Sequence, residues 1–140
     1  MTIATRPIPH PSAWSKGYWD AARERRFVVQ ECQDCAKLNM YPKRFCPHCL
    51  SDGLVWKQSN GRGTIYSVTT QLAGPPTGFA DLLPYVIAII QLDEGVQLMS
   101  NIVGENRLDA KIGDTVEVDF EVVDENVTLP VFRLAGAAHG

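Results

Sequence analysis

The chain of 140 residues has a formal net charge of −3, and 45% of its residues are hydrophobic while 21% are charged. This composition is typical of a globular chain with one domain or two small ones. No run of 18 apolar residues occurs, and the first seven residues lack the apolar core of a secretory signal. The sequence therefore predicts neither a membrane span nor export, and we expect a cytoplasmic protein.

The charge is distributed unevenly along the chain. Residues 1–59 carry nine Lys or Arg and five Asp or Glu, a net charge of +4. Residues 60–140 carry four Lys or Arg and eleven Asp or Glu, a net charge of −7. A basic front half and an acidic back half indicate two modules with different surroundings.

Residues 1–26 are expected to form an arm and a helix. Residues 1–12 contain three prolines and show no hydrophobic period, which favours an extended arm. Residues 12–26 show apolar side chains at the spacing of an amphipathic helix, although Gly17 weakens this prediction by about 1 kcal/mol relative to alanine. The residues that support the helix are the apolar Trp14, Tyr18, Trp19 and Ala22, the N-cap candidates Ser12 and Ser15, and Arg25 and Arg26 at its C-terminal end.

Two short cysteine clips dominate residues 27–59. The clips are Cys32-Gln-Asp-Cys35 and Cys46-Pro-His-Cys49, and ten residues separate them. Each clip follows an apolar segment that reads as one arm of a hairpin, and residues 54–58 read as a strand that leaves the second clip. Two hairpins that present their turns to one ion describe a zinc ribbon.

Four thiolates around one cation form the tetrahedral sulfur cage that suits Zn²⁺. Because all four positions would be filled by protein, the predicted zinc is structural and has no open position for a catalytic water. Two alternatives stay open: iron in a rubredoxin-like cage, and a redox dithiol at Cys46 and Cys49. His48 stands between two ligands on a tight turn, so we expect its ring to point outward.

The pattern changes to that of β-strands after Gly61-Arg-Gly63. Residues 105–111 read as a short helix or loop. The segment 85–92 is almost wholly apolar, as a strand buried on both faces would be. The predicted strands are 64–72, 85–92, 97–103, 115–122 and 131–134, with Val116, Val118, Phe120 and Val122 facing inward.

Five strands with Gly-rich turns suit a small, partly open barrel of the oligonucleotide/oligosaccharide-binding (OB) type. The predicted fold class is therefore mainly β, with an N-terminal helix, a rubredoxin-like zinc ribbon and a C-terminal OB-fold barrel. The predicted division is residues 1–26 for the arm and helix, 27–59 for the ribbon and 60–140 for the OB domain.

Two further sets of residues each allow two interpretations. A basic set lies near the helix end and the ribbon, and it forms either a solvated face or a site for the phosphates of a carrier such as CoA. An apolar set lies on the helix and on the long loop 73–84, and it forms either core or a surface that docks on a partner. The basic set is Arg23, Arg25, Arg26, Lys43 and Arg44, and the apolar set is Trp14, Tyr18, Trp19, Phe79, Leu82 and Leu83.

Several functions are poorly supported by these residues. The net charge of −7 on the barrel half would repel a phosphate backbone, so the charge argues against binding of nucleic acid. The chain has no Gly-x-Ser-x-Gly elbow, no phosphate-cradling loop and no His-Glu-x-x-His motif. Its histidines are His10, His48 and His139, so we expect no catalytic residues.

The chain resembles the family of zinc-ribbon/OB-fold acyl-CoA-associated proteins, long catalogued as a domain of unknown function. The resemblance covers roughly residues 14–134. It rests on the order and spacing of short stretches, namely Tyr18-Trp19, Phe27-Val-Val-Gln-Glu-Cys32, Tyr41-Pro-Lys-Arg-Phe-Cys-Pro-His-Cys49, Gly61-Arg-Gly63, Ile65-Tyr-Ser67, Pro84-Tyr-Val86, Leu92-Asp-Glu-Gly95 and Ile112-Gly-Asp-Thr-Val116.

The resemblance implies a non-catalytic accessory subunit that carries one structural zinc on Cys32, Cys35, Cys46 and Cys49. Such relatives join thiolase-like enzymes that make or break carbon–carbon bonds of acyl-CoA thioesters, as in steroid retro-aldolases and benzoylsuccinyl-CoA thiolase, and the catalytic residues belong to the partner. Two alternatives remain, a free-standing acyl-CoA binding module and a nucleic-acid-binding zinc-ribbon protein. No individual acyl-CoA contact follows from the resemblance.

Overall fold

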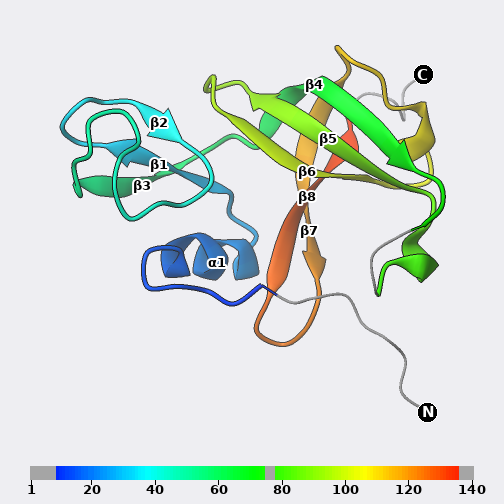
Figure 1. Cartoon of the computed structure of the whole chain (residues 1–140), viewed down its shortest axis with the longest axis horizontal. Helices are drawn as coiled ribbons and strands as arrows, with labels where there is room; N and C mark the ends of the chain where they lie inside the picture. Colours follow the sequence, from blue (N-terminus) through cyan, green and yellow to red (C-terminus); the bar gives the residue numbers. More distant parts are fainter. Residues whose placement is uncertain (1–8, 75–77, 136–140) are drawn as a thin grey trace.

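The computed structural model describes residues 9–74 and 78–135 of the chain. A ribbon of three strands lies at one end, a barrel of five strands lies at the other, and one helix lies below them (Figure 1). The elements are α1 (Lys16–Arg23), β1 (Val28–Cys32), β2 (Leu38–Asn39), β3 (Leu54–Gln58), β4 (Arg62–Gln71), η1 (Ala80–Leu82), β5 (Tyr85–Leu92), β6 (Gln97–Val103), η2 (Arg107–Asp109), β7 (Thr115–Val122) and β8 (Thr128–Leu134). Within the described residues, no helix is long and apolar enough to cross a membrane.

Helix α1 is shorter at both ends than the sequence predicts. Ser15 occupies the N-cap position without a side-chain cap, because its hydroxyl accepts a hydrogen bond from the Ser12 N–H instead. At the other end Arg25 adopts a left-handed conformation with φ of 62°, and its N–H bonds to the Ala22 carbonyl. The Arg26 N–H bonds to the Ala21 carbonyl, which completes a Schellman motif with arginine where glycine is usual. Arg25 and Arg26 therefore lie beyond the helix rather than in its last turn.

A chain of aromatic rings joins the helix to both sheets. Tyr18 of α1 meets Phe27 edge to face at 6.2 Å between ring centroids, and Phe27 meets Phe132 of β8 at 5.9 Å. All three side chains are buried in one hydrophobic core. Gly17 lies against the Trp56 indole of β3, and a Cβ at this position would overlap the indole ring. The glycine that weakens the helix prediction thus allows helix and ribbon to approach closely.

The ribbon is an antiparallel sheet in the order β2-β1-β3. The predicted return segment 38–45 contributes only the two residues of β2, and the rest forms the irregular approach to the second clip. The predicted strand 54–58 coincides with β3.

The barrel is closed in the order β4-β5-β6-β8-β7, which is the OB topology, whereas the sequence predicts a partly open one. Closure comes from a short parallel contact in which Ile102 and Val103 of β6 pair with Phe132 and Arg133 of β8. Strands β5, β6 and β7 have the predicted bounds.

Two predictions of burial within the barrel are wrong. Strand β5 is not buried on both faces, since alternate residues are fully buried and the others are half-buried or exposed. An antiparallel barrel presents only one face of each strand to its interior, so the apolar run in β5 exceeds what the core needs. Val122 does not face the core either, because it ends β7 beside the turn and its relative exposure is 70%.

Hydrogen bonds fix the ribbon against the barrel at two places. The Glu94 carboxylate, in the turn between β5 and β6, accepts from the Ser59 hydroxyl at 2.9 Å and from the Asn60 N–H at 3.1 Å. The Tyr41 hydroxyl, in the ribbon, donates to the Met99 carbonyl at 2.6 Å and accepts from the Met99 N–H at 2.5 Å. Met99 lies on the part of β6 that β8 does not reach, so Tyr41 satisfies backbone groups on a free strand edge.

We expect Tyr41→Phe to lower the free energy of unfolding by about 1 kcal/mol, because both hydrogen bonds to Met99 are lost while water can reach the exposed edge. Burial raises the pKa of the Tyr41 hydroxyl, so it remains protonated and able to donate at neutral pH. Urea denaturation measures the change. Tyr66→Phe is the matched control, since Tyr66 is exposed on β4. Equal effects of the two substitutions on the free energy of unfolding would show that the Tyr41 hydroxyl does not stabilise the contact between ribbon and barrel.

Candidate metal centre and neighbouring surfaces

The two cysteine clips have the same backbone conformation. In the first clip the Ala36 N–H donates to the Cys32 carbonyl at 2.8 Å, and in the second the Leu50 N–H donates to the Cys46 carbonyl at 2.8 Å. Ala36 and Leu50 both adopt left-handed backbone conformations, with φ of 64° and 66°. Each turn folds back tightly enough to aim its two sulfur atoms in one direction.

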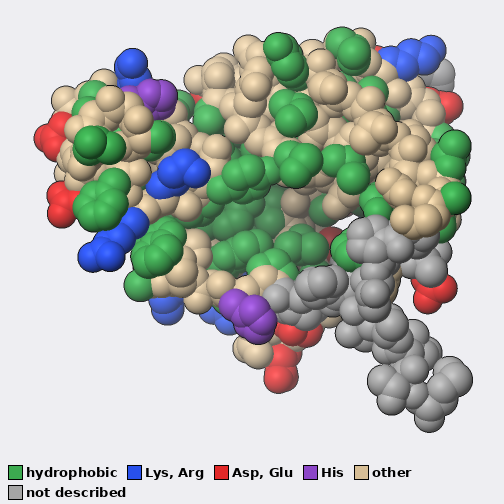
Figure 2. All heavy atoms as spheres, in the orientation of Figure 1, with side chains coloured by type: hydrophobic (Ala, Val, Ile, Leu, Met, Phe, Trp, Pro, Cys, Tyr) green, Lys and Arg blue, Asp and Glu red, His purple; other side chains and the backbone are tan. Residues whose placement is uncertain are grey.

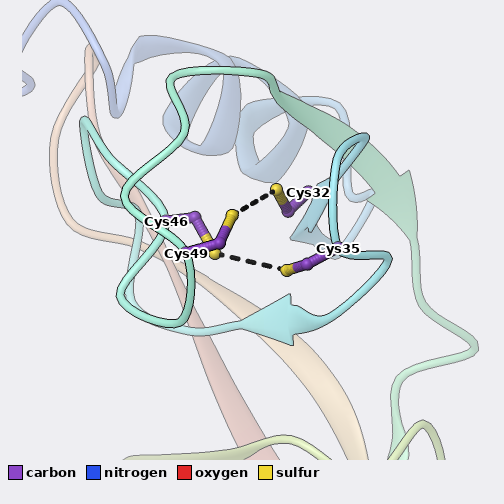
Figure 3. A group of neighbouring side chains, drawn as sticks. All are labelled: Cys32, Cys35, Cys46 and Cys49. Atoms are coloured by element: carbon purple, nitrogen blue, oxygen red, sulfur yellow. Dashed lines mark hydrogen bonds between the residues drawn. The ribbon is translucent and has the colours of Figure 1, made fainter.

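The four sulfur atoms converge on one point between the clips (Figure 3). All lie within 4.8 Å of one another, with 3.6 Å between Cys32 Sγ and Cys49 Sγ and 3.7 Å between Cys35 Sγ and Cys46 Sγ. A tetrahedral zinc site with Zn–S bonds of about 2.3 Å requires sulfur atoms about 3.8 Å apart. The donor set and its spacing therefore fit one zinc ion held by four cysteines.

The electrostatics of the cluster also call for a cation. Backbone N–H groups, first that of Cys35 and then that of Asp34, lower the pKa of Cys32 to about 7. The Ser51 N–H likewise lowers the pKa of Cys49, but burial and the sulfur atoms of Cys32, Cys35 and Cys46 outweigh it and raise that pKa to about 12. Several thiolates at this distance repel one another, so full ionisation of the set needs a positive ion among them.

One side-chain and one backbone hydrogen bond hold the two clips in register. The Ser51 hydroxyl donates to Asp34, and the Gln33 N–H donates to the Gly53 carbonyl at 2.9 Å. His48 contributes its backbone N–H to Cys46 Sγ at 3.3 Å, and its ring is not part of the ligand cluster.

Gln30 helps to position the second clip, a role that the sequence does not predict. Its buried side chain accepts hydrogen bonds from the Asn39 amide and the Lys43 N–H, both at 2.7 Å, and donates to the Lys43 carbonyl at 2.9 Å. These bonds shape the loop that leads into the second clip. The feature of the sequence that could have pointed to Gln30 is its position as a lone amide side chain within the apolar segment before the first clip.

The structure does not gather the predicted phosphate-binding residues into an unpaired cluster. Arg23 pairs with Asp20 at 3.1 Å, Arg26 with Glu24 at 2.5 Å, and Arg25 with Asp119 at 3.1 Å while stacking over Phe120. Arg44 stacks over the Phe45 ring, and Lys43 is tied to Gln30 through its backbone. Most of this positive charge is therefore opposed by a carboxylate or directed at a ring.

The predicted docking residues divide into three groups. Tyr18 is a core residue, with a relative exposure of 6%, so its side chain is not available to a partner. Trp14 is exposed, and Trp19 packs against the edge of the core. Phe79, Leu82 and Leu83 line a cavity of about 430 Å³ beside the barrel. Apolar side chains gather in a recess below the barrel strands in Figure 2.

Cys46→Ser should abolish stoichiometric zinc binding and lower the free energy of unfolding by about 3 kcal/mol or more, because a structural zinc site contributes roughly 10–16 kcal/mol of binding free energy. Elemental analysis of purified protein and thermal unfolding measure the two effects. Gln33→Ser, at an exposed position inside the other clip, is the control and should keep both values. Retention of one zinc per chain by the Cys46 variant would contradict a four-sulfur site.

The fold and the site together define a zinc-ribbon/OB-fold protein. Residues 19–55 match the rubredoxin-like zinc ribbon domain of ChsH2, and residues 56–121 match the C-terminal OB-fold domain of ChsH2. The chain therefore belongs to the ChsH2 (DUF35) family of accessory and scaffold subunits.

Relatives and solved structures agree with this assignment. The chain is 36% identical over 132 residues to a probable enoyl-CoA hydratase alpha subunit of Thermomonospora curvata, covering 94% of this chain but only 41% of that one. It is 33% identical over 96 residues to a DUF35 domain-containing scaffold protein of Methanothermobacter thermautotrophicus, covering 68% and 71% of the two chains. A chain of the Ltp2-ChsH2(DUF35) aldolase superposes with a TM-score of 0.80 at 35% identity, covering 91% of this chain and 99% of that one. A DUF35 structure from Sulfolobus solfataricus shares the fold, with a TM-score of 0.60 at 12% identity.

Proposed function

We propose that the chain is a non-catalytic, zinc-containing accessory subunit of a thiolase-like enzyme complex that acts on acyl-CoA thioesters. The observation that carries this proposal is the likeness to the chain of the Ltp2-ChsH2(DUF35) aldolase, 99% of which this chain covers. A protein that matches a whole subunit of a named complex is expected to have the same kind of partner. Carbon–carbon bond cleavage or formation would then take place on residues of that partner.

The chemistry of the zinc centre agrees with a supporting role. A cage of four sulfur ligands has no position for water or substrate, so its bound zinc would stabilise the ribbon rather than activate a reactant. In this proposal the barrel and the loop before β5 help to exclude water from the acyl-CoA channel of the partner.

The surface of the ribbon supports docking. Phe45 has a relative exposure of 49%, and Leu50 of 78%, although both are large apolar side chains. Leu50 also adopts a left-handed conformation that costs a non-glycine residue about 1 kcal/mol. The left-handed conformation belongs to the clip turn, as at Ala36, but a leucine side chain this exposed adds little packing to the fold, which favours a role in contact with a partner.

The two alternative functions have less support. A free-standing acyl-CoA module would need unopposed cations for the CoA phosphates, whereas the three arginines next to α1 each pair with a carboxylate. A nucleic-acid-binding role would need a basic barrel, and residues 60–140 carry a net charge of −7.

The direct test is purification of the untagged chain from its native lysate, followed by native mass spectrometry. We expect a stable hetero-complex with a thiolase-fold subunit, and we expect acyl-CoA turnover only in the fractions that contain that subunit. Calorimetry of the isolated chain with CoA should show no tight binding. The proposal would be contradicted if the chain eluted alone while other fractions held the full acyl-CoA turnover. It would also be contradicted if the isolated chain turned over an acyl-CoA by itself.

Leu50→Gly should change the isolated chain and the complex in opposite directions. Glycine relieves the left-handed strain, so we expect the free energy of unfolding of the isolated chain to rise by about 0.5–1 kcal/mol. Loss of the exposed side chain should weaken the complex about tenfold, as measured by titration of the partner. Ala36→Gly is the matched control, because it relieves the same strain in the first clip and removes only one methyl group. Equal affinities of the two variants would exclude Leu50 from the interface.

A further inference from the structure

A groove on the barrel offers a binding surface that neither the zinc centre nor the ribbon uses. It encloses about 430 Å³ between the segment that carries η1, the start of β5 and the end of β6. The apolar part of its wall includes Phe79, Leu82, Leu83 and Tyr85. The Phe79 and Tyr85 rings are 5.7 Å apart, so the loop side of the wall rests on the barrel side.

Arg107 fixes the far end of this groove. Its Nε donates to the Pro84 carbonyl at 2.9 Å, and its Nη1 donates to the Gly104 carbonyl at 3.1 Å. These bonds tie the end of the loop to the end of β6. The guanidinium is thus occupied in holding the walls together, and two of its donors are already used.

The groove lies where OB folds commonly bind their ligands. In this topology the second and third barrel strands and the loop between the first two strands form the binding face. Here those elements are β5, β6 and the loop between β4 and β5, and each of them contributes to the groove. The place of the groove on the barrel therefore predicts that it binds a ligand, and the side chains that line the groove determine which kind of ligand fits.

The rim of the groove is acidic. Asp81, Glu105 and Glu121 all line it, against the single positive charge of Arg107. Asp81 and Glu105 are exposed, and within residues 9–74 and 78–135 neither carboxylate forms a hydrogen bond or an ion pair. Nucleic acid, CoA phosphates and other polyanions would be repelled by this rim. An apolar floor beside the unpaired carboxylates of Asp81 and Glu105 suits apolar side chains flanked by cations.

We propose that the groove binds a segment of a partner polypeptide in which apolar side chains are flanked by Lys or Arg. The apolar side chains would enter between Leu82 and Tyr85, and the flanking cations would pair with Asp81 and Glu105. This inference rests on the proposed function, because it assigns a second contact to the accessory subunit, on the barrel rather than on the ribbon. It also separates the partner contact from the acyl-CoA ligand.

The test selects peptides from a displayed library of random twelve-residue sequences on the purified, zinc-loaded full chain. We expect the selected peptides to combine apolar residues with Lys or Arg, and synthetic copies to bind with an affinity that falls about tenfold in Asp81→Asn/Glu105→Gln. The matched control is Asp52→Asn/Glu125→Gln, which removes the same charge from exposed carboxylates outside the groove and should keep full binding.

Each other outcome overturns the inference. Selected peptides that are acidic or uncharged would exclude charge pairing at the rim, and unchanged binding in the groove variant would move the site elsewhere. Displacement of the peptide by CoA or a short-chain acyl-CoA at micromolar concentration would make the groove a thioester site. A homodimer in sedimentation that Leu82→Asp dissociates would make a second copy the occupant.

The peptide test is independent of the test for a hetero-complex. If the chain selects basic, apolar peptides but forms no complex with a thiolase-fold subunit, the proposed function is contradicted and the peptide-binding groove is supported. If a stable hetero-complex forms and is unaffected by Asp81→Asn/Glu105→Gln, and no such peptides are selected, the proposed function is supported and peptide binding in the groove is contradicted.

Discussion

Mutual repulsion among four sulfur atoms is the constraint on which the ribbon depends. The sulfurs of Cys32, Cys35, Cys46 and Cys49 lie within 4.8 Å of one another, a spacing that favours protonated thiols unless a cation lies among them. Strand β2 of the ribbon has only two residues, β3 leaves four of its five residues exposed, and the buried Val28 and Val29 of β1 belong to a core shared with the helix and the barrel. A metal ion among the sulfur atoms replaces their repulsion by attraction, and it therefore supplies stabilisation that the small core of the ribbon cannot.

The order imposed at the metal extends to the barrel through a few specific contacts. Gln30 shapes the loop that contains Tyr41, and Tyr41 in turn bonds to Met99 of β6. The rings of Tyr18, Phe27 and Phe132 provide a second connection through the core. A partner that binds both the ribbon and the barrel would thus meet two surfaces whose relative position is already fixed, which lowers the entropic cost of association.

The sequence was sufficient for the parts of the structure that follow from local chemistry. Cysteine spacing identified the metal ligands, and alternating apolar residues located β7 to the residue. It was insufficient wherever a distant residue decides the outcome. The role of Gly17 depends on Trp56, 39 positions away, and the true end of α1 depends on Arg25, whose side chain reaches Asp119 on β7. Tyr18 illustrates the same limit, since helical spacing places an aromatic residue on a face but does not show what covers that face.

The linker between ribbon and barrel has a consequence for how members of such a family can be recombined. Residues 59 and 60 are held by the carboxylates of Asp93 and Glu94, which belong to a hairpin turn more than thirty residues further along. A chimera that joins this ribbon to a foreign barrel at the linker would lose both acceptors, even though neither is adjacent to the splice. When ribbons are exchanged between relatives, we expect the relative position of ribbon and barrel to be preserved only if the β5–β6 turn is exchanged together with the ribbon.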